Sequence, residues 1–322
     1  MRNFAHVKAT TLDEAVSFLR RYGNKAAVIA GGTDLLGKMK DEILPTYPEA
    51  LVNIKTIPGL DFIAYRDNLL AIGALTRLED IATNEIIRNA YPALAEAARR
   101  TASAHLREMG TLGGNLCQDI RCWYYRNPNN RFPCLRKGGG RCYAIDGDNR
   151  YHSIFGGSVE QGCYAVHPSD TAPALIALDA TIKTTRRAIK AEDFFQVNVV
   201  KTTVLDDDEI VTEIQIPTPP GKSAFVKFAL RKAIDFPIVN CAAMVTVSKK
   251  KVTAVRICLN AVYVTPYRAI KAEEAITGKA INEASAEAAG AAAVSDAKPL
   301  THNAYMVPVA RAMVKRAIMG CL

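Results

Sequence analysis

The sequence lacks the features of a membrane or exported protein. Its 322 residues contain no apolar run near the roughly 18 residues that a membrane-spanning helix needs. Residues 1–6 (MRNFAH) carry no apolar signal core. We therefore expect a cytoplasmic protein without a membrane span. The hydrophobic fraction of 49% and the charged fraction of 23% are those of a soluble globular chain.

Signals of nucleic-acid binding are also missing. The net charge is +9, but lysine and arginine are scattered, and no basic helix or aromatic-rich nucleic-acid motif is present. We expect no nucleic-acid partner. Residues 121–150 nevertheless hold seven cationic side chains and only two acidic ones. Such an excess is a solvated face, the counterpart of a buried anionic centre, or a surface for an acidic partner.

Two common cofactor signatures are absent as well. There is no Gly-x-Gly-x-x-Gly fingerprint, so a Rossmann dinucleotide fold is not indicated. There is no Cys-x-x-Cys pair, so the usual zinc-knuckle pattern is missing. Five of the eight cysteines nevertheless fall between residues 117 and 163, whereas Cys241, Cys258 and Cys321 stand alone. In a reducing compartment, clustered cysteines are more often metal ligands than disulfides.

The cysteine cluster lies in a long segment, residues 111–170, that has neither helical nor strand periodicity. Within it Cys122, Cys134, Cys142 and Cys163 sit among glycines, prolines and aromatic residues. Four thiolates suit a [4Fe-4S] cluster and also a tetrahedral zinc site, and the spacing alone leaves both open. We therefore expect an irregular, metal-stapled insertion.

Regular elements are expected on both sides of this segment. They are a helix over 11–22 ended by Gly23, strands over 26–30, 51–54 and 69–72, helices over 77–83 and 85–100, and a strand over 209–216. Glycine turns follow at 31–33 and 111–115. Such turns let backbone N–H groups approach a phosphate, although each alone is also compatible with a plain tight turn.

A second domain is expected after the linker at 217–221 (PTPPG). Alternating patterns predict strands over 224–230, 242–248 and 252–259, and alanine-rich segments predict helices over 269–278, 281–293 and 306–319. The C-terminal part therefore reads as an α+β domain that begins near residue 222.

Three motifs in order carry a resemblance to a known family. Residues 30–36 (AGGTDLL), 110–116 (GTLGGNL) and 168–174 (PSDTAPA) resemble the FAD-binding medium subunit of molybdenum hydroxylases, the xanthine dehydrogenase and carbon monoxide dehydrogenase flavoprotein family. The resemblance implies an α+β fold with a two-part FAD-binding domain of the vanillyl-alcohol-oxidase/PCMH type, an iron–sulfur insertion loop, and a C-terminal domain with a three-stranded antiparallel sheet and helices. The implied boundaries are 1–221 (subdomains 1–55 and 56–221, insertion 117–165) and 222–322.

The resemblance also implies which residues contact FAD. The two glycine segments would hold the diphosphate, and Asp170 would lie nearer the flavin ring. The implied FAD-binding set is Ile29, Ala30, Gly31, Gly32, Thr33, Asp34, Leu35, Leu36, Thr101, Thr111, Gly113, Gly114, Asn115, Asp170, Ile210, Lys227 and Arg231.

Most members of the family lack the cysteine-rich insertion. Its presence is similar to a smaller branch that includes the β subunit of 4-hydroxybenzoyl-CoA reductase and the flavoprotein of a bacterial aldehyde oxidoreductase, in which the insertion carries a [4Fe-4S] cluster. Residues 115–122 (NLCQDIRC) are more similar to the reductase. The resemblance implies Cys122, Cys134, Cys142 and Cys163 as ligands and leaves Cys117 outside the set.

The implied function is electron transfer inside a larger enzyme. The resemblance implies a large partner subunit with the molybdenum cofactor, a small partner with two [2Fe-2S] clusters, a dimer of such heterotrimers, and ferredoxin as a candidate electron donor. No catalytic acid or base is nominated in this chain. The alternatives are the flavin subunit of an aldehyde oxidoreductase or xanthine dehydrogenase, a stand-alone flavin oxidase, and a non-catalytic zinc-stapled nucleotide-binding module.

Overall fold

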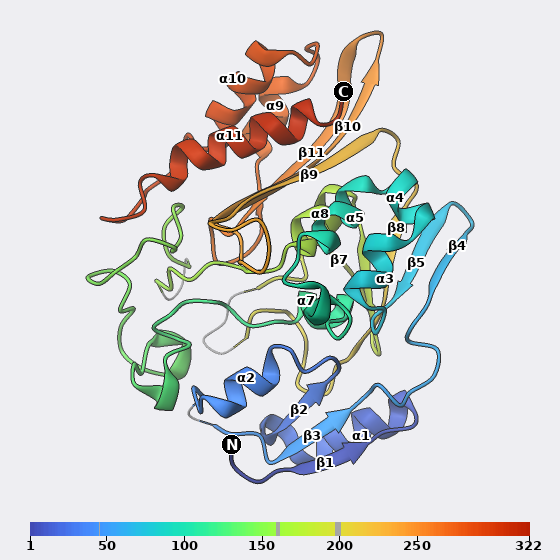
Figure 1. The fold of residues 1–322 in the computed structure, drawn as a ribbon, viewed down its shortest axis with the longest axis vertical. Coiled ribbons are helices and arrows are strands. Elements are labelled where there is room, and N and C mark those ends of the chain that lie inside the picture. The colour runs from blue at the N-terminus through green and yellow to red at the C-terminus, as the bar shows by residue number, and fades with distance from the viewer. Residues whose placement is uncertain (45, 159–161, 197–200) are drawn as a thin grey trace.

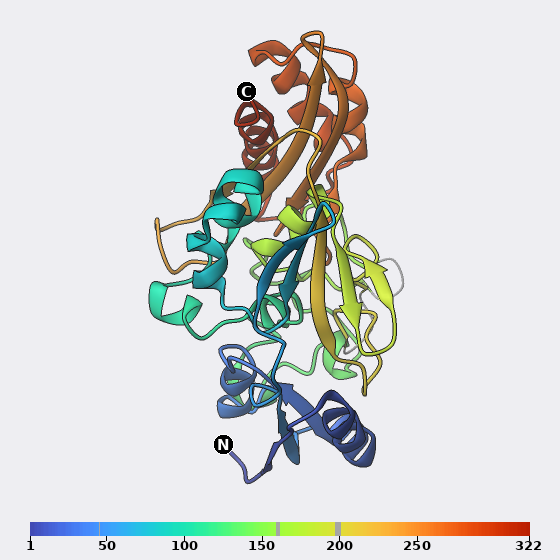
Figure 2. The same ribbon diagram turned by 90° about the vertical axis from the view of Figure 1, so that its right-hand side faces the viewer.

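Three sheets succeed one another along the long axis of the molecule (Figures 1 and 2). The computed structural model describes residues 1–44, 46–158, 162–196 and 201–322. The N-terminal unit lies at one end, a five-stranded sheet with its helices lies in the middle, and the C-terminal sheet and helices lie at the other end. None of the helices in these described ranges is long and apolar enough to cross a membrane.

The N-terminal unit is a parallel sheet in the order β1-β3-β2. Its elements are β1 (Ala5–Lys8), α1 (Leu12–Tyr22), β2 (Ala26–Ile29), α2 (Leu35–Lys40) and β3 (Ala50–Asn53). Helix α1 starts where the Thr11 side chain accepts from the Glu14 N–H and ends at Gly23, whose φ is 56°. The predicted helix and both predicted strands are confirmed here; β1 and α2 were not predicted.

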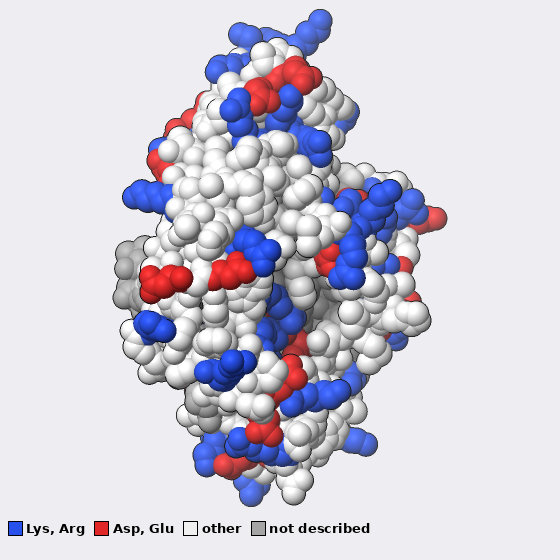
Figure 3. Space-filling view, turned by 60° about the vertical axis from the view of Figure 1, so that its left-hand side comes forward, with Lys and Arg blue, Asp and Glu red and all other residues white. Residues whose placement is uncertain are grey.

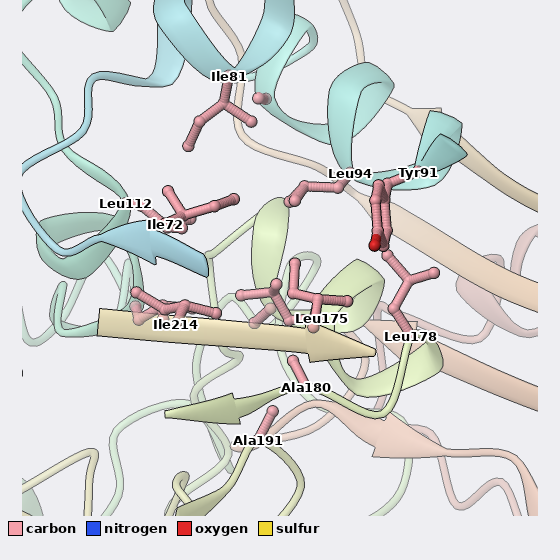
Figure 4. Close-up of a cluster of buried hydrophobic side chains, with 14 of the residues drawn as sticks. Ile72, Ile81, Tyr91, Leu94, Leu112, Leu175, Leu178, Ala180, Ala191 and Ile214 are labelled. Atoms are coloured by element: carbon pink, nitrogen blue, oxygen red, sulfur yellow. The ribbon is translucent and has the colours of Figure 1, made fainter. Parts of the chain in front are cut away.

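The middle unit is a sheet in the order β4-β5-β8-β6-β7. Its strands are β4 (Ile63–Arg66), β5 (Leu69–Gly73), β6 (Thr181–Thr184), β7 (Ala188–Lys190) and β8 (Val211–Pro217), and its helices are α3 (Leu78–Thr83), α4 (Glu85–Ala90), α5 (Pro92–Arg99) and α8 (Thr171–Ala177). Side chains such as Ile72, Ile214 and Leu175 meet in the core between sheet and helices (Figure 4). The candidate site described below lies beside this core.

The single helix predicted over 85–100 is wrong. The chain leaves helical geometry at Tyr91, which has φ −130° and ψ 52°, and restarts with Pro92 at the beginning of α5. Proline disfavours a helical conformation in the residue before it but fits the first helical position, so the break follows from local chemistry.

The segment between these elements is largely irregular, as predicted. It contains the short helices α6 (Ala104–Arg107) and α7 (Leu112–Leu116) and two 3-10 turns at Pro128–Asn130 and Leu135–Lys137. The prediction of a glycine turn at 111–115 is wrong. The segment forms helix α7 instead, and the Thr111 side chain caps its N-terminus. The insertion appears in green at the left of Figure 1.

The C-terminal unit is a sheet in the order β12-β11-β10-β9 covered by helices. Its elements are β9 (Lys222–Phe228), β10 (Val239–Ser248), β11 (Lys251–Asn260), β12 (Tyr267–Arg268), α9 (Ile270–Ile276), α10 (Glu283–Ala293) and α11 (Met306–Met319). The three expected antiparallel strands are present, and the two-residue β12 adds a fourth at the edge of the sheet. All three expected helices are confirmed.

Candidate functional site

A cavity of about 370 Å³ lies where the N-terminal unit, the middle unit and the β9–β10 connection meet. This size falls within the range of small-molecule and cofactor sites. Figure 3 shows a face that is hollowed near its middle, with charged side chains of both signs recessed there. The predicted residues that line the cavity are Ile29, Ala30, Gly31, Gly32, Thr33, Asp34, Leu35, Thr101, Thr111, Gly113, Gly114, Asn115, Asp170 and Ile210.

The first glycine segment turns directly out of β2. A Cβ on Gly31 would lie 1.9 Å from the carbonyl oxygen of Met109, so only glycine lets these two backbones pack. Gly32 has φ +72°, which glycine adopts without strain. The backbone N–H groups of residues 31–35 find no hydrogen-bond acceptor among the described residues. They are therefore available to an anionic ligand in the cavity.

The second glycine segment has a different role. The N–H of Leu112 donates to Thr76 O at 2.9 Å, that of Gly113 donates to Ala74 O at 2.9 Å, and that of Gly114 donates to Thr111 Oγ1 at 3.2 Å. The N–H groups of residues 112–115 are thus used within the protein. Thr111, Gly113, Gly114 and Asn115 line the cavity, but the N–H groups of the last three are not free for a ligand.

Asp34 lies at the cavity but is engaged by the insertion. Its Oδ1 is 2.8 Å from a guanidinium nitrogen of Arg121 and 2.8 Å from one of Arg126, and its Oδ2 accepts from the Asp119 N–H at 2.9 Å. Burial would raise the pKa of Asp34, but Arg126, Arg121, Lys38 and the Asp119 N–H together outweigh it and the pKa is lowered. Asp34 therefore ties the first glycine segment to the insertion.

Asp170 is likewise paired within the chain. Its Oδ2 accepts from Lys227 Nζ at 2.7 Å and its Oδ1 accepts from Asn240 Nδ2 at 2.7 Å, all in the interior. Burial raises the pKa of Asp170, while Lys227 opposes the rise. Lys227 therefore acts on the site from behind Asp170 and does not line the cavity.

The other two predicted residues outside the cavity lining have clear positions. Leu36 packs its side chain against Gly32, with Cδ1 3.1 Å from where a Cβ would be. Arg231 is exposed and ion-paired with Asp235, which does line the cavity. Phe236 also lines the cavity, and its ring centroid is 4.4 Å from the Arg121 guanidinium carbon.

The four predicted ligand cysteines come together at a second, smaller cavity. Cys122, Cys134, Cys142 and Cys163 all line it, together with Tyr124, Tyr125 and Tyr143, whereas Cys117 lines the large cavity instead. The void is about 10 Å³, the space of about one water molecule. In this arrangement no three His, Cys, Asp or Glu side chains of the described residues are placed to hold a single metal ion.

The surroundings of these thiols are buried and cationic. Arg136 is 2% exposed and Lys137 is 7% exposed, and Lys137 Nζ has no hydrogen-bond partner among the described residues. Burial raises the pKa of Cys163 to about 11, against the lowering effect of Arg136. His152, which sequence reasoning did not connect to the thiols, has Nε2 3.2 Å from Cys122 Sγ, and burial lowers its pKa to about 4.

Comparison with known proteins agrees with this geometry. Residues 2–219 match the family described as the FAD binding domain in molybdopterin dehydrogenase, and residues 224–320 match the CO dehydrogenase flavoprotein C-terminal domain. The fold and the large cavity thus define an FAD-binding oxidoreductase subunit. The chain belongs to the molybdenum hydroxylase family, as an FAD-binding medium subunit of the carbon monoxide dehydrogenase and aldehyde oxidoreductase type.

Individual relatives cover most of the chain. The aldehyde oxidoreductase FAD-binding subunit PaoB of Escherichia coli is 35% identical over 257 residues, which are 76% of this chain and 78% of that protein. The carbon monoxide dehydrogenase medium chain of Hydrogenophaga pseudoflava is 28% identical over 320 residues, 98% of this chain and 96% of that one. A solved structure of the H. pseudoflava enzyme, lacking the Mo-pyranopterin moiety, superposes with a TM-score of 0.78 at 27% identity, covering 99% of this chain and 97% of that chain.

Proposed function

We propose that this chain is the FAD- and [4Fe-4S]-binding electron-transfer subunit of a heteromeric molybdenum hydroxylase. The iron–sulfur assignment rests on one observation: four thiols that are distant in sequence line the same small cavity. Four thiolates are the usual ligands of such a cluster. The chemistry of the donor set, four cysteines that line one cavity, therefore fits the cluster.

The charges around the thiols support this assignment. A [4Fe-4S] cluster with four thiolates carries net negative charge, and a buried lysine without a hydrogen-bond partner is unfavourable unless it faces an anion. Arg136 lines the cavity of the four thiols, and Lys137, its neighbour in sequence, interacts electrostatically with Cys134 and Cys122. These cations would offset the charge of the cluster. The local excess of basic residues noted in the sequence thus has a buried component.

For FAD, we propose that the free N–H groups of residues 31–35 hold the diphosphate, and that α7 shapes the cavity wall by its glycines. Asp34 would position the insertion rather than contact phosphate. Lys227 and Asp170 would serve FAD binding together, as a buried ion pair of which Asp170 lines the cavity. The domain boundaries 1–221 and 222–322, with subdomains 1–55 and 56–221 and insertion 117–165, remain part of this proposal.

The bound cofactors would supply one- and two-electron transfer, and the partners would supply substrate chemistry. We propose a molybdenum-cofactor large subunit and a small subunit with two [2Fe-2S] clusters as partners, in a dimer of heterotrimers. The similarity of residues 115–122 supports a 4-hydroxybenzoyl-CoA reductase with ferredoxin as donor. The 35% identity to an aldehyde oxidoreductase subunit favours aldehyde oxidation as the second candidate.

Metal and flavin analysis of the purified native complex tests the assignment. We expect FAD, and iron with acid-labile sulfide near four per chain beyond the partners' clusters, by the stoichiometry of a cubane. Cys134→Ser should lose that iron and keep FAD, because a ligand is removed from the small cavity only. Cys117→Ser is the matched control and should keep the iron.

Each failure has a distinct meaning. Zinc in place of iron would replace the cluster by a structural tetrahedral site. Loss of iron in Cys117→Ser, with retention in Cys134→Ser, would show that the ligand set is wrong. Turnover of a coenzyme A thioester rather than an aldehyde by the native complex would decide between the two candidate substrates.

A further inference from the structure

His152 lies beside one of the four thiols, and its side chain makes no other hydrogen bond with the described residues. It is 1% exposed, and its Nε2 lies 3.2 Å from Cys122 Sγ. The rings of Trp123 and Tyr124 flank the imidazole at centroid distances of 5.8 and 5.9 Å. The ring is therefore held in a narrow range of orientations.

The backbone of His152 is fixed from the C-terminal unit. Its N–H donates to Asn149 O at 3.1 Å, and its carbonyl accepts from Asn303 Nδ2 at 2.9 Å. Asn149 and Asn303 are both fully buried, and the His302 N–H donates to Asn149 Oδ1 at 2.8 Å. Asn303 is 151 residues away in sequence, and Asn149 is itself bound by the His302 N–H, so the position of the imidazole is set by the tertiary structure.

The tautomer follows from the surroundings of the other ring nitrogen. Nδ1 of His152 is buried without a hydrogen-bond partner among the described residues. A buried N–H without an acceptor costs more than an unpaired lone pair, which favours the proton on Nε2. A cysteine sulfur bound to iron has no proton and only accepts. The contact with Cys122 is then an Nε2–H donor to the sulfur.

We propose that His152 is a positioning residue that donates an Nε2–H hydrogen bond to the Cys122 sulfur and thereby raises the reduction potential of the cluster bound there. The inference rests on the proposed [4Fe-4S] site. Hydrogen bonds to ligand sulfurs stabilise the more negative, reduced cluster, and they are one of the means by which proteins set iron–sulfur potentials. The contact reaches one ligand only, so it also makes the four thiols inequivalent.

Redox titration of the native complex, followed by electron paramagnetic resonance, tests this role. His152→Leu removes the donor, and we expect the oxidised-to-reduced ratio of this cluster at a fixed potential to rise about tenfold, which is about 59 mV for one electron. His152→Gln places an amide N–H near the position of Nε2 and should restore most of the shift. His105→Gln removes an exposed histidine on α6 and should leave the potential unchanged.

A second measurement does not depend on a variant. In wild-type protein labelled with ¹⁵N-histidine, electron–nuclear double resonance of the reduced cluster should show coupling to one imidazole nitrogen and to an exchangeable proton. If His152→Leu fails to retain iron, this spectrum decides alone. Wild-type complex without the cluster would overturn the proposed function. A cluster with no such coupling, or with equal potentials in iron-loaded His152→Leu, would overturn this inference and leave the cluster assignment intact.

Discussion

Asp34 offers the sharpest test of how the insertion is held in place. Its carboxylate faces Arg121 and Arg126 at 2.8 Å each, and the side chains of these three residues are 16%, 26% and 16% exposed. Asp34→Asn keeps the shape and an oxygen that accepts from the Asp119 N–H, but it removes the charge. The substitution therefore isolates the two ion pairs.

The magnitude lies between two limits. Exposed ion pairs contribute about 0–1 kcal/mol, and removal of one partner of a buried pair costs about 3–5 kcal/mol. Because these groups are mostly but not fully buried, we expect Asp34→Asn to lower the free energy of unfolding by about 2 kcal/mol. Arg126 retains its bonds to Ile120 O and Asp119 O, so Arg121 should lose most.

The chain supplies its own probe for the assay. Its single tryptophan, Trp123, lies inside the insertion, so tryptophan fluorescence in a urea titration reports on this segment while circular dichroism reports on the whole fold. Asp41→Asn removes an exposed carboxylate at the end of α2 and should change stability by less than about 0.5 kcal/mol. If the fluorescence transition of Asp34→Asn moves no further than that of Asp41→Asn, the ion pairs do not hold the insertion.

Two further predictions concern the cavity and pH. Gly31→Ala should lower the flavin content of purified protein severalfold, because the new Cβ would be 1.9 Å from Met109 O, whereas Gly37→Ala meets nothing within 4 Å and should keep FAD; equal flavin absorbance would contradict the packing argument. Burial holds the pKa of His167 at about 3, below its ordinary 6.5, so the unfolded chain binds an extra proton between these values and stability falls as pH drops below 6.5. The slope from this group is about 1.4 kcal/mol per pH unit, and urea titrations of His167→Phe should show a flatter decline; the same slope would refute this attribution.

Elements whose causes are local were predictable from the sequence. Helix α1 was bounded correctly because Thr11 and Gly23 act on neighbouring backbone. Strand β1 was missed because its pairing, Ala5 with Ala50, depends on a distant segment. The break at Tyr91 has a local cause in Pro92 and could have been read from the sequence.

The candidate site shows the same division. The motif at residues 30–36 singled out a segment that lines the large cavity. The four cysteines that the family resemblance implied as ligands line the small cavity. The role of Asp34 was not predictable, because its arginine partners meet it only in the folded chain. The contact between His152 and Cys122 spans 30 residues of irregular chain, where no periodicity relates the two positions.

The insertion is attached at both ends of the molecule. Asp34 binds it to the N-terminal unit, while Ile154 donates to Val262 O and accepts from the Lys298 N–H in the C-terminal unit. The insertion therefore bridges the N-terminal and C-terminal units. A ligand that binds only the folded insertion adds its binding free energy to the stability of every part of the chain that unfolds together with the insertion. Binding of the proposed cluster would therefore raise the melting temperature of both end units.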